Sequence, residues 1–422
     1  MRVCHFEEAV ESLTPLTLTR PAFDLRCGVR TLAEKQRRVL GADDWTMWVR
    51  PHLAEVAGLE HPGRPVNDLA WLASAPTVWV NARWLPTQAS AVPTHVPHLG
   101  ICEGQIAWAF VAPEHLAGLA ETGLEPLLDE WSRTLLTQPT AGTMFQHAWE
   151  LVERNGDEIV ADAHGAVDLP CGPVDNLTIV GPANRVHIAP TARIDPFVVL
   201  NTTQGPIVIG ERVVVTAFTR IEGPCVLGPG TQVMGAKLRG GVTLGPQCRI
   251  GGEVETSIVH GYTNKYHEGF LGHSYLGEWV NLGAGTHSSD LRSDYGPVDV
   301  ILDGRRIATG RNKVGCFVGD HSKTGLGTLL NTGTNIGAFC NLLPAGRLAG
   351  KHLPSFTNWS HGALDAGMPI ESLLETARIV MSRRGRSLTS AHIRLYEAIY
   401  AATDAERIRA LRERDQPMRR AA

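Results

Sequence analysis

The sequence predicts an α/β domain, a left-handed parallel β-helix and a helical tail, in that order along 422 residues. Three observations lead to this prediction. Short apolar runs alternate with helical patterns in the first part of the chain. Aliphatic residues then recur at every sixth position, many of them followed by glycine or another small residue, and helical spacing returns after that region. We expect domains at residues 1–165, 174–351 and 352–422, with a linker at 165–173.

The N-terminal domain is expected to contain a mainly parallel sheet. Residues 46–49, 78–80 and 106–111 are apolar runs typical of buried strands. The segment 144–155, with the sequence MFQHAWELVERN, has the spacing of a helix. Alternation of strands and helices favours an α/β arrangement.

The central region carries a six-residue repeat. Its clearest run occupies five successive sixth positions, Val318, Thr324, Leu330, Ile336 and Leu342. A period of six suits a triangular solenoid, in which each hexapeptide supplies one short strand and one corner. The aliphatic side chain points into the interior, and the small residue after it permits the corner backbone.

The repeat loses its register at residues 253–270 and again at 288–315, and we expect insertions at both places. The sequence VDVILDGRRIATG in the second one predicts a β-hairpin around Asp303 and Gly304. Insertions that project from a rigid scaffold often carry ligand contacts.

The tail after residue 351 has the spacing of helices. One predicted helical face consists of Ile370, Leu373, Leu374, Ala377, Val380 and Met381. A second helix is marked by Ile393, Tyr396, Ile399 and Tyr400. Such a tail can cap the open end of a solenoid. Arg383, Arg384 and Arg386 are expected to form a solvated face rather than an anion site.

Composition bears on the partners and the cellular location of the protein. The net charge of −4 gives no reason to expect a nucleic-acid or membrane partner. No apolar run is long enough to span a bilayer, and the start MRVCHFEEAVES lacks the apolar stretch of a signal peptide. The eight cysteines are isolated, without a CxxC pair, so we expect reduced thiols and a cytoplasmic location.

Two segments carry a family resemblance. GHSYLGEWVNLGAGTHSSDL at residues 272–291, and residues 298–346, resemble the acetyltransferase half of bifunctional UDP-N-acetylglucosamine pyrophosphorylase/glucosamine-1-phosphate acetyltransferases, most of all the archaeal sugar-1-phosphate nucleotidylyltransferase/acetyltransferases. The resemblance implies a hexapeptide-repeat acyltransferase. Its donor would be acetyl-coenzyme A or another coenzyme A thioester, its acceptor an amino-sugar phosphate or sugar nucleotide, and its assembly a homotrimer.

The N-terminal half resembles the nucleotidylyltransferase half of that family, but less closely than the central region resembles the acetyltransferase half. LTPLTLTRP at residues 13–21 is similar to the segment after the family's Gly-rich loop. Where that loop would cradle a triphosphate, this chain has Glu7 and Glu8, whose carboxylates would repel phosphates. Ala22 stands at the family's lysine position, and the segment Val80-Asn81-Ala82-Arg83 stands where the family has the aspartate that binds Mg²⁺. We therefore expect a degenerate nucleotidylyltransferase-like domain, with Mg²⁺ needed only if the domain is active.

His273 is the predicted catalytic base, since a neutral imidazole accepts a proton readily near pH 7. Only Ser274 separates it from Tyr275, whereas the family has two residues at this place. His321, with Lys323 nearby, is the alternative base. A structural histidine is the competing interpretation for His273.

The resemblance also implies binding residues. Tyr275 and Asn281 match family positions that hold the sugar phosphate and the amino sugar, although a packing aromatic and an amide ladder are equally open interpretations. Ala284, Gly285 and Ala345 fall where backbone groups of the family face coenzyme A, and Lys323 is predicted as a further cofactor contact.

Arg305 and Arg306, on the second insertion with Arg311 and Lys313, are predicted to bind phosphate, because guanidinium groups suit bidentate contacts. A solvated hairpin is the alternative. The central histidines do not reproduce the spacing of β-helix zinc enzymes, so no metal site is predicted.

Three functions follow from these patterns. The leading hypothesis is acyl transfer to an amino-sugar phosphate or sugar nucleotide. The second is a sugar-1-phosphate nucleotidylyltransferase, of the UDP-N-acetylglucosamine diphosphorylase or glucose-1-phosphate thymidylyltransferase type, with a solenoid for assembly. The third is a non-catalytic scaffold that binds sugar nucleotides.

Overall fold

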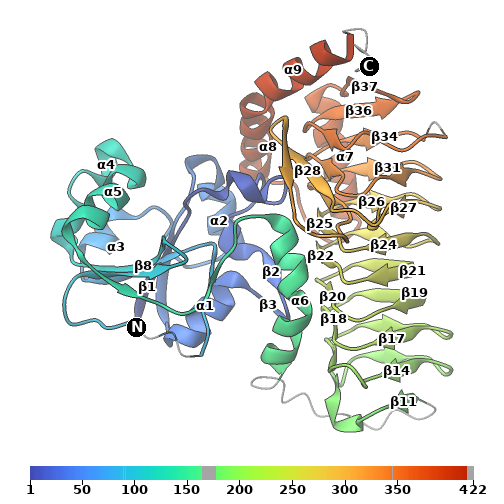
Figure 1. Ribbon diagram of the computed structural model, residues 1–422, viewed down its shortest axis with the longest axis horizontal. Helices are drawn as coiled ribbons and strands as arrows, with labels where there is room; N and C mark the ends of the chain where they lie inside the picture. The colour runs from blue at the N-terminus through green and yellow to red at the C-terminus, as the bar shows by residue number, and fades with distance from the viewer. Residues whose placement is uncertain (89, 91, 164–176, 345, 416–422) are drawn as a thin grey trace. The chain divides into compact units, whose positions relative to one another are not determined.

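The computed structural model describes residues 1–88, 90, 92–163, 177–344 and 346–415 (Figure 1). They form two compact units, each with its own core. The first consists of Met1–Leu13, Thr19–Leu25 and Arg30–His147. The second consists of Thr14–Leu18, Arg26–Val29 and Ala148–Ala422. The linker expected at residues 165–173 lies outside the described residues.

The first unit is built on one sheet which, over the residues described, has six strands in the order β4-β1-β5-β8-β7-β9. These are β1 (Arg2–Phe6), β4 (Asp44–Trp48), β5 (Thr77–Asn81), β7 (His98–Cys102), β8 (Gln105–Val111) and β9 (Leu136–Pro139). The pairs β1–β4, β1–β5 and β7–β9 are parallel, whereas β5–β8 and β7–β8 are antiparallel. The three predicted strands are confirmed as β4, β5 and β8.

Short helices and ribbons complete the first unit. The helices are α1 (Leu32–Leu40), α2 (Ala54–Glu60), α3 (Leu69–Ala73), α4 (Leu119–Thr122) and α5 (Leu124–Thr134). Further strands of this unit are β3 (Arg30–Thr31), β6 (Trp84–Leu85) and β10 (Thr143–Met144), whereas β2 (Arg26–Cys27) belongs to the second unit. One core, between the sheet and α5, contains Trp79 and Trp131, whose ring centroids lie 5.7 Å apart.

The second unit is a three-sided solenoid of short parallel strands (Figure 1). Its first face consists of β12 (Val186–Ile188), β15 (Ile207–Ile209), β18 (Cys225–Leu227), β20 (Val242–Leu244), β22 (Ile258–Gly261), β25 (Tyr275–Glu278), β30 (Phe317–Val318), β33 (Asn335–Ile336) and β35 (His352–Leu353). The second face contains β13 (Arg193–Ile194), β16 (Val214–Val215), β23 (Asn264–Lys265), β26 (Asn281–Leu282), β31 (Lys323–Thr324), β34 (Asn341–Leu342) and β36 (Thr357–Ser360).

The third face contains β11 (Thr178–Val180), β14 (Val199–Asn201), β17 (Arg220–Glu222), β24 (Phe270–Gly272), β27 (His287–Ser288) and β32 (Leu329–Leu330). Two longer strands, β19 (Gln232–Leu238) and β21 (Arg249–Glu255), run from the second face into the third. The strand β37 (Ala363–Ala366) ends the sheet by pairing antiparallel with β36.

Aliphatic side chains stack inside the solenoid from coil to coil. On the first face Ile209 pairs in register with Leu227, Leu227 with Leu244, and Leu244 with Val259, and all four are buried. Each such burial contributes roughly 1.5–3 kcal/mol of hydrophobic stabilisation. The predicted left-handed parallel β-helix of hexapeptide repeats is confirmed.

One of the two predicted insertions is wrong. Residues 253–270 continue the coil through β21, β22, β23 and β24. The pattern is obscured because Lys265 takes the interior position next to Ile250, and because the interior residues Val254 and Val259 are five positions apart instead of six. The second insertion is real and contains the predicted hairpin, β28 (Asp299–Leu302) and β29 (Arg305–Ala308).

The helix predicted at 144–155 is α6 (Ala148–Ala163), which begins four residues later because Thr143 and Met144 form β10. It packs on the first face of the solenoid, where Ile159 contacts Val208 and Val226. Asn155 of α6 is fully buried there. Its Oδ1 accepts hydrogen bonds from Gly28 N (2.7 Å) and Thr243 Oγ1 (3.0 Å), and its Nδ2 donates to Gly241 O (2.9 Å).

The tail consists of α7 (Ile370–Ser382), α8 (Ser390–Ala402) and α9 (Asp404–Asp415). Both helices that the sequence predicts are present, and α9 is an additional one. On the predicted faces Leu373, Ala377 and Met381 are buried in α7, and Tyr396 and Ile399 in α8. α9 contacts β37 and places Ala410 and Leu411 against the solenoid core, as expected of a cap.

A ladder of aromatic rings follows the corner between the first and second faces. Its rungs are Tyr262, Trp279, His321, Phe339 and Phe356, all with φ between 52° and 63°. Neighbouring ring centroids lie 4.4, 6.1, 4.6 and 5.1 Å apart, with nearly parallel planes. Two tyrosines of α8 pack edge-on against the ladder, Tyr396 on Phe339 and Tyr400 on Phe356. The ladder therefore gives the tail an aromatic surface to pack on.

Replacing Asn155 with leucine is expected to destabilise the second unit. The Gly28 N–H and the Gly241 carbonyl would lose a buried partner, at about 1–3 kcal/mol for each orphaned group. The thermal midpoint should fall when unfolding is followed by circular dichroism. Asp157→Leu, at an exposed position of the same helix, is the control and should change the midpoint little. Equal midpoints for the two variants would contradict this role of Asn155.

Lys265 provides a test based on pH. Burial lowers its pKa from 10.5 to about 8, and its Nζ donates to Gly251 O (2.8 Å) and His267 O (3.1 Å). Because the unfolded chain holds this proton more tightly, the stability of the protein relative to a Lys265→Met variant should rise as the pH rises from about 8 to 10.5. The full change is of the order of 3 kcal/mol. Denaturant titrations across this range measure it, and Lys237→Met, at an exposed site, should give no such trend.

Candidate functional site

His273 lies at the corner between the third and first faces, directly after β24, with φ at 46°. Its Nδ1 lies 2.7 Å from Oδ2 of Asp290, and the two side chains are 18% and 11% exposed. The same carboxylate oxygen also lies against the backbone of Gly272, where an added Cβ atom would come within 2.4 Å of it. Hydrogen bonds from His273 N to Glu255 O (3.1 Å) and from Gly315 N to His273 O (2.9 Å) fix its backbone.

The pairing with Asp290 determines what this imidazole can do. A carboxylate accepts a hydrogen bond, so the proton resides on Nδ1 and the lone pair on Nε2. A histidine oriented in this way is suited to removing a proton from a substrate. His273 was predicted from the sequence, whereas Asp290 was not. The spacing of 17 residues, one coil of the solenoid, is the signal that could have found it.

Charged side chains continue from this pair over the third face. The carboxylate of Glu255 lies 3.5 Å from both Lys313 Nζ and Arg239 Nη1. Arg239 also contacts Glu253 at 3.0 Å. A polar surface thus adjoins the corner that holds His273.

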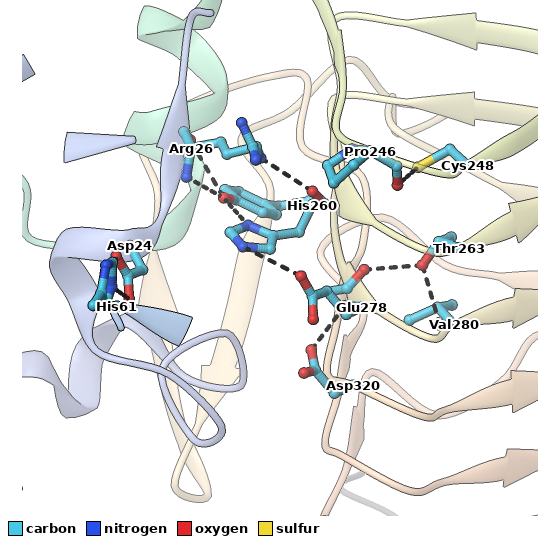
Figure 2. A network of polar contacts seen from close by, with 12 residues as sticks. Asp24, Arg26, His61, Pro246, Cys248, His260, Thr263, Glu278, Val280 and Asp320 are labelled. Carbon is cyan, nitrogen blue, oxygen red and sulfur yellow. Dashed lines mark hydrogen bonds and ion pairs between the residues drawn. The ribbon is translucent and has the colours of Figure 1, made fainter. Parts of the chain in front are cut away.

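Tyr275 lies in the core of the second unit, fully buried. Its hydroxyl oxygen accepts a hydrogen bond from Arg26 N (2.8 Å) and lies 3.2 Å from His260 Nδ1. Figure 2 shows the surrounding contacts, in which Arg26 Nε donates to His260 O (3.1 Å) and Glu278 N donates to Asp320 (2.8 Å). The hydroxyl therefore holds the segment at residues 26–29 on the first face, and its predicted contact with substrate stays a prediction.

The alternative base, His321, is a rung of the aromatic ladder and only 1% exposed. Its ring stacks between Trp279 and Phe339, and its Nε2 lies 3.0 Å from the hydroxyl of Tyr396. Of the two candidate bases, His273 is the one with access to solvent.

Asn281 and Lys323 lie next to each other on the second face, in register on successive coils. Both line a cavity of about 180 Å³. Its other lining residues are Tyr262, Asn264, Trp279, Val280, Val380, Arg383 and Arg384. Burial lowers the pKa of Lys323 to about 8, and its Nζ donates to His321 O at 2.8 Å. His273 is not among the lining residues, so the predicted site residues occupy two places on the solenoid.

The positions predicted to face coenzyme A contain small residues at another corner. Ala284 O accepts from Gly327 N (2.7 Å), and Gly285 N donates to Glu268 O (2.9 Å), so these backbone groups join neighbouring coils. Ala345 lies outside the described residues. Contact of this corner with coenzyme A stays a prediction.

The hairpin arginines are solvated. Arg305 and Arg306 are exposed on β29, and Arg306 Nη1 donates to Asp299 at 3.1 Å. Arg311 pairs with Glu153 of α6. Phosphate binding by Arg305 and Arg306 stays a prediction without further support here.

In the first unit, carboxylates and arginines neutralise each other after β1. The side chain of Glu7 is 3% exposed and accepts hydrogen bonds from Ala22 N (3.0 Å) and from Arg50 Nε and Nη2 (3.1 and 3.0 Å). Glu8 accepts from Asn81 Nδ2 (2.8 Å) and lies 3.9 Å from the buried Arg83. Burial raises the pKa of Glu8.

These contacts test the Mg²⁺ site that the family resemblance implies. The Oδ1 of Asn81 accepts from Arg83 N at 3.0 Å, so the amide oxygen that could replace a carboxylate ligand is engaged beside a cation. The residues present do not fit Mg²⁺ with a triphosphate. Over the described part of the chain, no group of three or more histidine, cysteine, aspartate or glutamate side chains is arranged to hold a metal ion.

Comparison with known proteins finds one family model and several relatives that align over part of their length. Residues 3–167 match the family model described as sugar nucleotidyl transferase. A bifunctional sugar-1-phosphate nucleotidylyltransferase/acetyltransferase of Sulfurisphaera tokodaii is 38% identical over 92 residues, which are 22% of this chain and 23% of that protein. The chain resembles the bifunctional nucleotidylyltransferase/acetyltransferases.

A second curated relative aligns over a similar length. The bifunctional protein GlmU of Methanocaldococcus jannaschii is 35% identical over 88 residues, 21% of each chain. The aligned region therefore spans less than a quarter of these relatives. A solved UDP-N-acetylglucosamine acyltransferase of Francisella novicida gives a TM-score of 0.34 at 13% identity, covering 57% of this chain and 89% of that one. Among the described helices, none is long and apolar enough to cross a membrane.

Proposed function

We propose that the protein is an acyltransferase that moves an acyl group from a coenzyme A thioester to the amine of an amino-sugar phosphate or sugar nucleotide. The observation that carries this proposal is the pair of His273 and Asp290 at a solvent-accessible corner of the solenoid. The resemblance to bifunctional nucleotidylyltransferase/acetyltransferases supports the class of donor and acceptor.

In the proposed reaction, Nε2 of His273 removes a proton from the acceptor amine as its nitrogen attacks the thioester carbonyl. Asp290 holds the imidazole in the required tautomer and stabilises the imidazolium that forms. The tetrahedral intermediate then expels the thiolate of coenzyme A, which takes the proton from the imidazolium. The products are an amide and free coenzyme A.

Four accompanying expectations belong to this proposal. Acetyl-coenzyme A is the expected donor, and Ala284, Gly285 and Lys323 are the described residues expected to contact it. We also expect a homotrimer and a cytoplasmic location, which sedimentation velocity and cell fractionation measure.

Purified protein with acetyl-coenzyme A and glucosamine 1-phosphate is expected to release free thiol in proportion to N-acetylated product. His273→Ala should lower this rate by about 10²- to 10⁴-fold, the usual contribution of a general base. Asp290→Asn should also lower it, because an amide can present its donor to Nδ1 and favour the wrong tautomer.

His267→Ala, at an exposed histidine of the same solenoid, is the matched control and should retain full activity. Unchanged acyl transfer in His273→Ala would show that another group is the base. The absence of thiol release with glucosamine 1-phosphate and with UDP-glucosamine would count against the acyltransferase itself.

Nucleotidyl transfer is the second candidate, favoured by the match of residues 3–167 to the sugar nucleotidyl transferase family. Against it stand Glu7 and Glu8, which already neutralise Arg50 and Arg83 where a triphosphate would need positive charge.

Protein incubated with Mg²⁺, a sugar 1-phosphate and UTP or dTTP is therefore expected to release no pyrophosphate above background, as a coupled phosphate assay would measure. Release that depends on the sugar phosphate would make the first unit catalytic and overturn this expectation.

A further inference from the structure

The cavity on the second face lies between the solenoid and the end of α7. Asn264, Asn281 and Lys323 form its floor as an outward-facing column on three successive coils, with each residue in register with the next. Val380, Arg383 and Arg384 form the opposite wall. The aromatic rings of Tyr262 and Trp279 complete the lining.

Hydrogen bonds tie the wall to the floor. Arg384 Nη2 donates to Asn264 Oδ1 at 2.8 Å, and Asn264 Nδ2 donates to Asn281 Oδ1 at 3.3 Å. The guanidinium of Arg384 is thus held in place on the solenoid rather than free in solvent. Its Nε is buried and has no hydrogen-bond partner among the described residues. A buried donor without an acceptor lowers the stability of the folded state, so a ligand that supplies an acceptor to this Nε would be favoured.

The charged residues that line the cavity are all cationic. Lys323, Arg383 and Arg384 contribute three cationic side chains, and none of the lining residues is an aspartate or glutamate. Burial and the neighbouring Arg383 lower the pKa of Arg384, and burial lowers that of Lys323, as expected where cations lack anionic partners. Arg249, in register with Asn264 on the preceding coil, adds to the positive field at Arg384.

We propose that this cavity binds a phosphoryl group, held by Lys323, Arg383 and Arg384, with an adjoining part of the ligand against Tyr262. A phosphoryl group supplies the anionic acceptors that these donors lack, and arginine suits it through paired N–H groups. A cavity of about 150 Å³ holds benzene, so 180 Å³ admits a phosphoryl group with part of its carrier but not a whole cofactor. Of the arginines expected to form a solvated face, Arg383 and Arg386 are exposed, and Arg384 is partly buried.

Two phosphorylated ligands share this chemistry. One is coenzyme A, through its 3′-phosphate, and the other is a nucleoside diphosphate sugar, through its diphosphate. Both would place the phosphoryl group away from the corner that holds His273. The proposal concerns binding and does not require acyl transfer to occur.

The first experiment titrates inorganic pyrophosphate into the full-length protein by isothermal calorimetry. Arg384→Gln and Lys323→Gln should each weaken binding about ten-fold or more, the usual effect of losing a hydrogen bond to a charged group. Arg378→Gln, which removes one positive charge at an exposed position of α7 outside the cavity, should leave binding unchanged. His273→Ala should also bind normally, which separates this site from the proposed catalysis.

The second experiment identifies the source of the phosphoryl group. If the source is coenzyme A, the wild-type protein should bind coenzyme A that lacks the 3′-phosphate more weakly than intact coenzyme A. The Arg384→Gln variant should bind the two forms equally. If the source is a nucleotide sugar, Arg384→Gln should weaken the binding of UDP-glucose and leave the binding of coenzyme A unchanged. Circular dichroism confirms that each variant is folded. Absence of pyrophosphate binding at millimolar concentration, or folded Arg384→Gln and Lys323→Gln variants that bind pyrophosphate as tightly as the wild-type protein, would overturn the proposal.

Discussion

The in-register stacking of successive coils is the constraint on which the second unit depends. Interior side chains such as Leu227 and Leu244 superpose only when each coil has nearly the same length, so residues about one coil apart become neighbours on every face and corner. This places Asp290 beside His273 and Asn281 between Asn264 and Lys323. The candidate functional groups are thus positioned by a core that contains none of them.

Local patterns were sufficient to predict much of this fold. Hexapeptide spacing predicted the solenoid, the sequence around Asp303-Gly304 predicted the hairpin, and helical spacing predicted α7 and α8. The continuous coil at residues 253–270 was missed because a lysine stands where an aliphatic residue is expected. Lys265 satisfies its ammonium group with carbonyls of Gly251 and His267, a solution that hydrophobic periodicity does not register.

The candidate site was less accessible from the sequence, because its properties arise from contacts between distant residues. The motif located His273, but burial of Tyr275 depends on Arg26, which is 249 residues away. The orientation of Arg384 likewise depends on Asn264, at a separation of 120 residues. In the first unit, by contrast, the sequence already placed Glu7 and Glu8 where the resembled family has its phosphate loop, and the structure adds their pairing with Arg50 and Arg83.

The hydrogen bonds of Asn155 and Tyr275 also bear on how such a chain can be divided. A boundary drawn at the start of the repeats assigns α6 and residues 26–29 to the preceding domain, although their polar groups are satisfied by the first face of the solenoid. A fragment that begins with the repeats would expose that face, with the apolar side chains of Val208 and Val226 uncovered. An exchange of domains between relatives would therefore have to transfer residues 26–29 and α6 together with the coils. The two halves of this chain cannot be exchanged at the start of the repeats without exposing the first face.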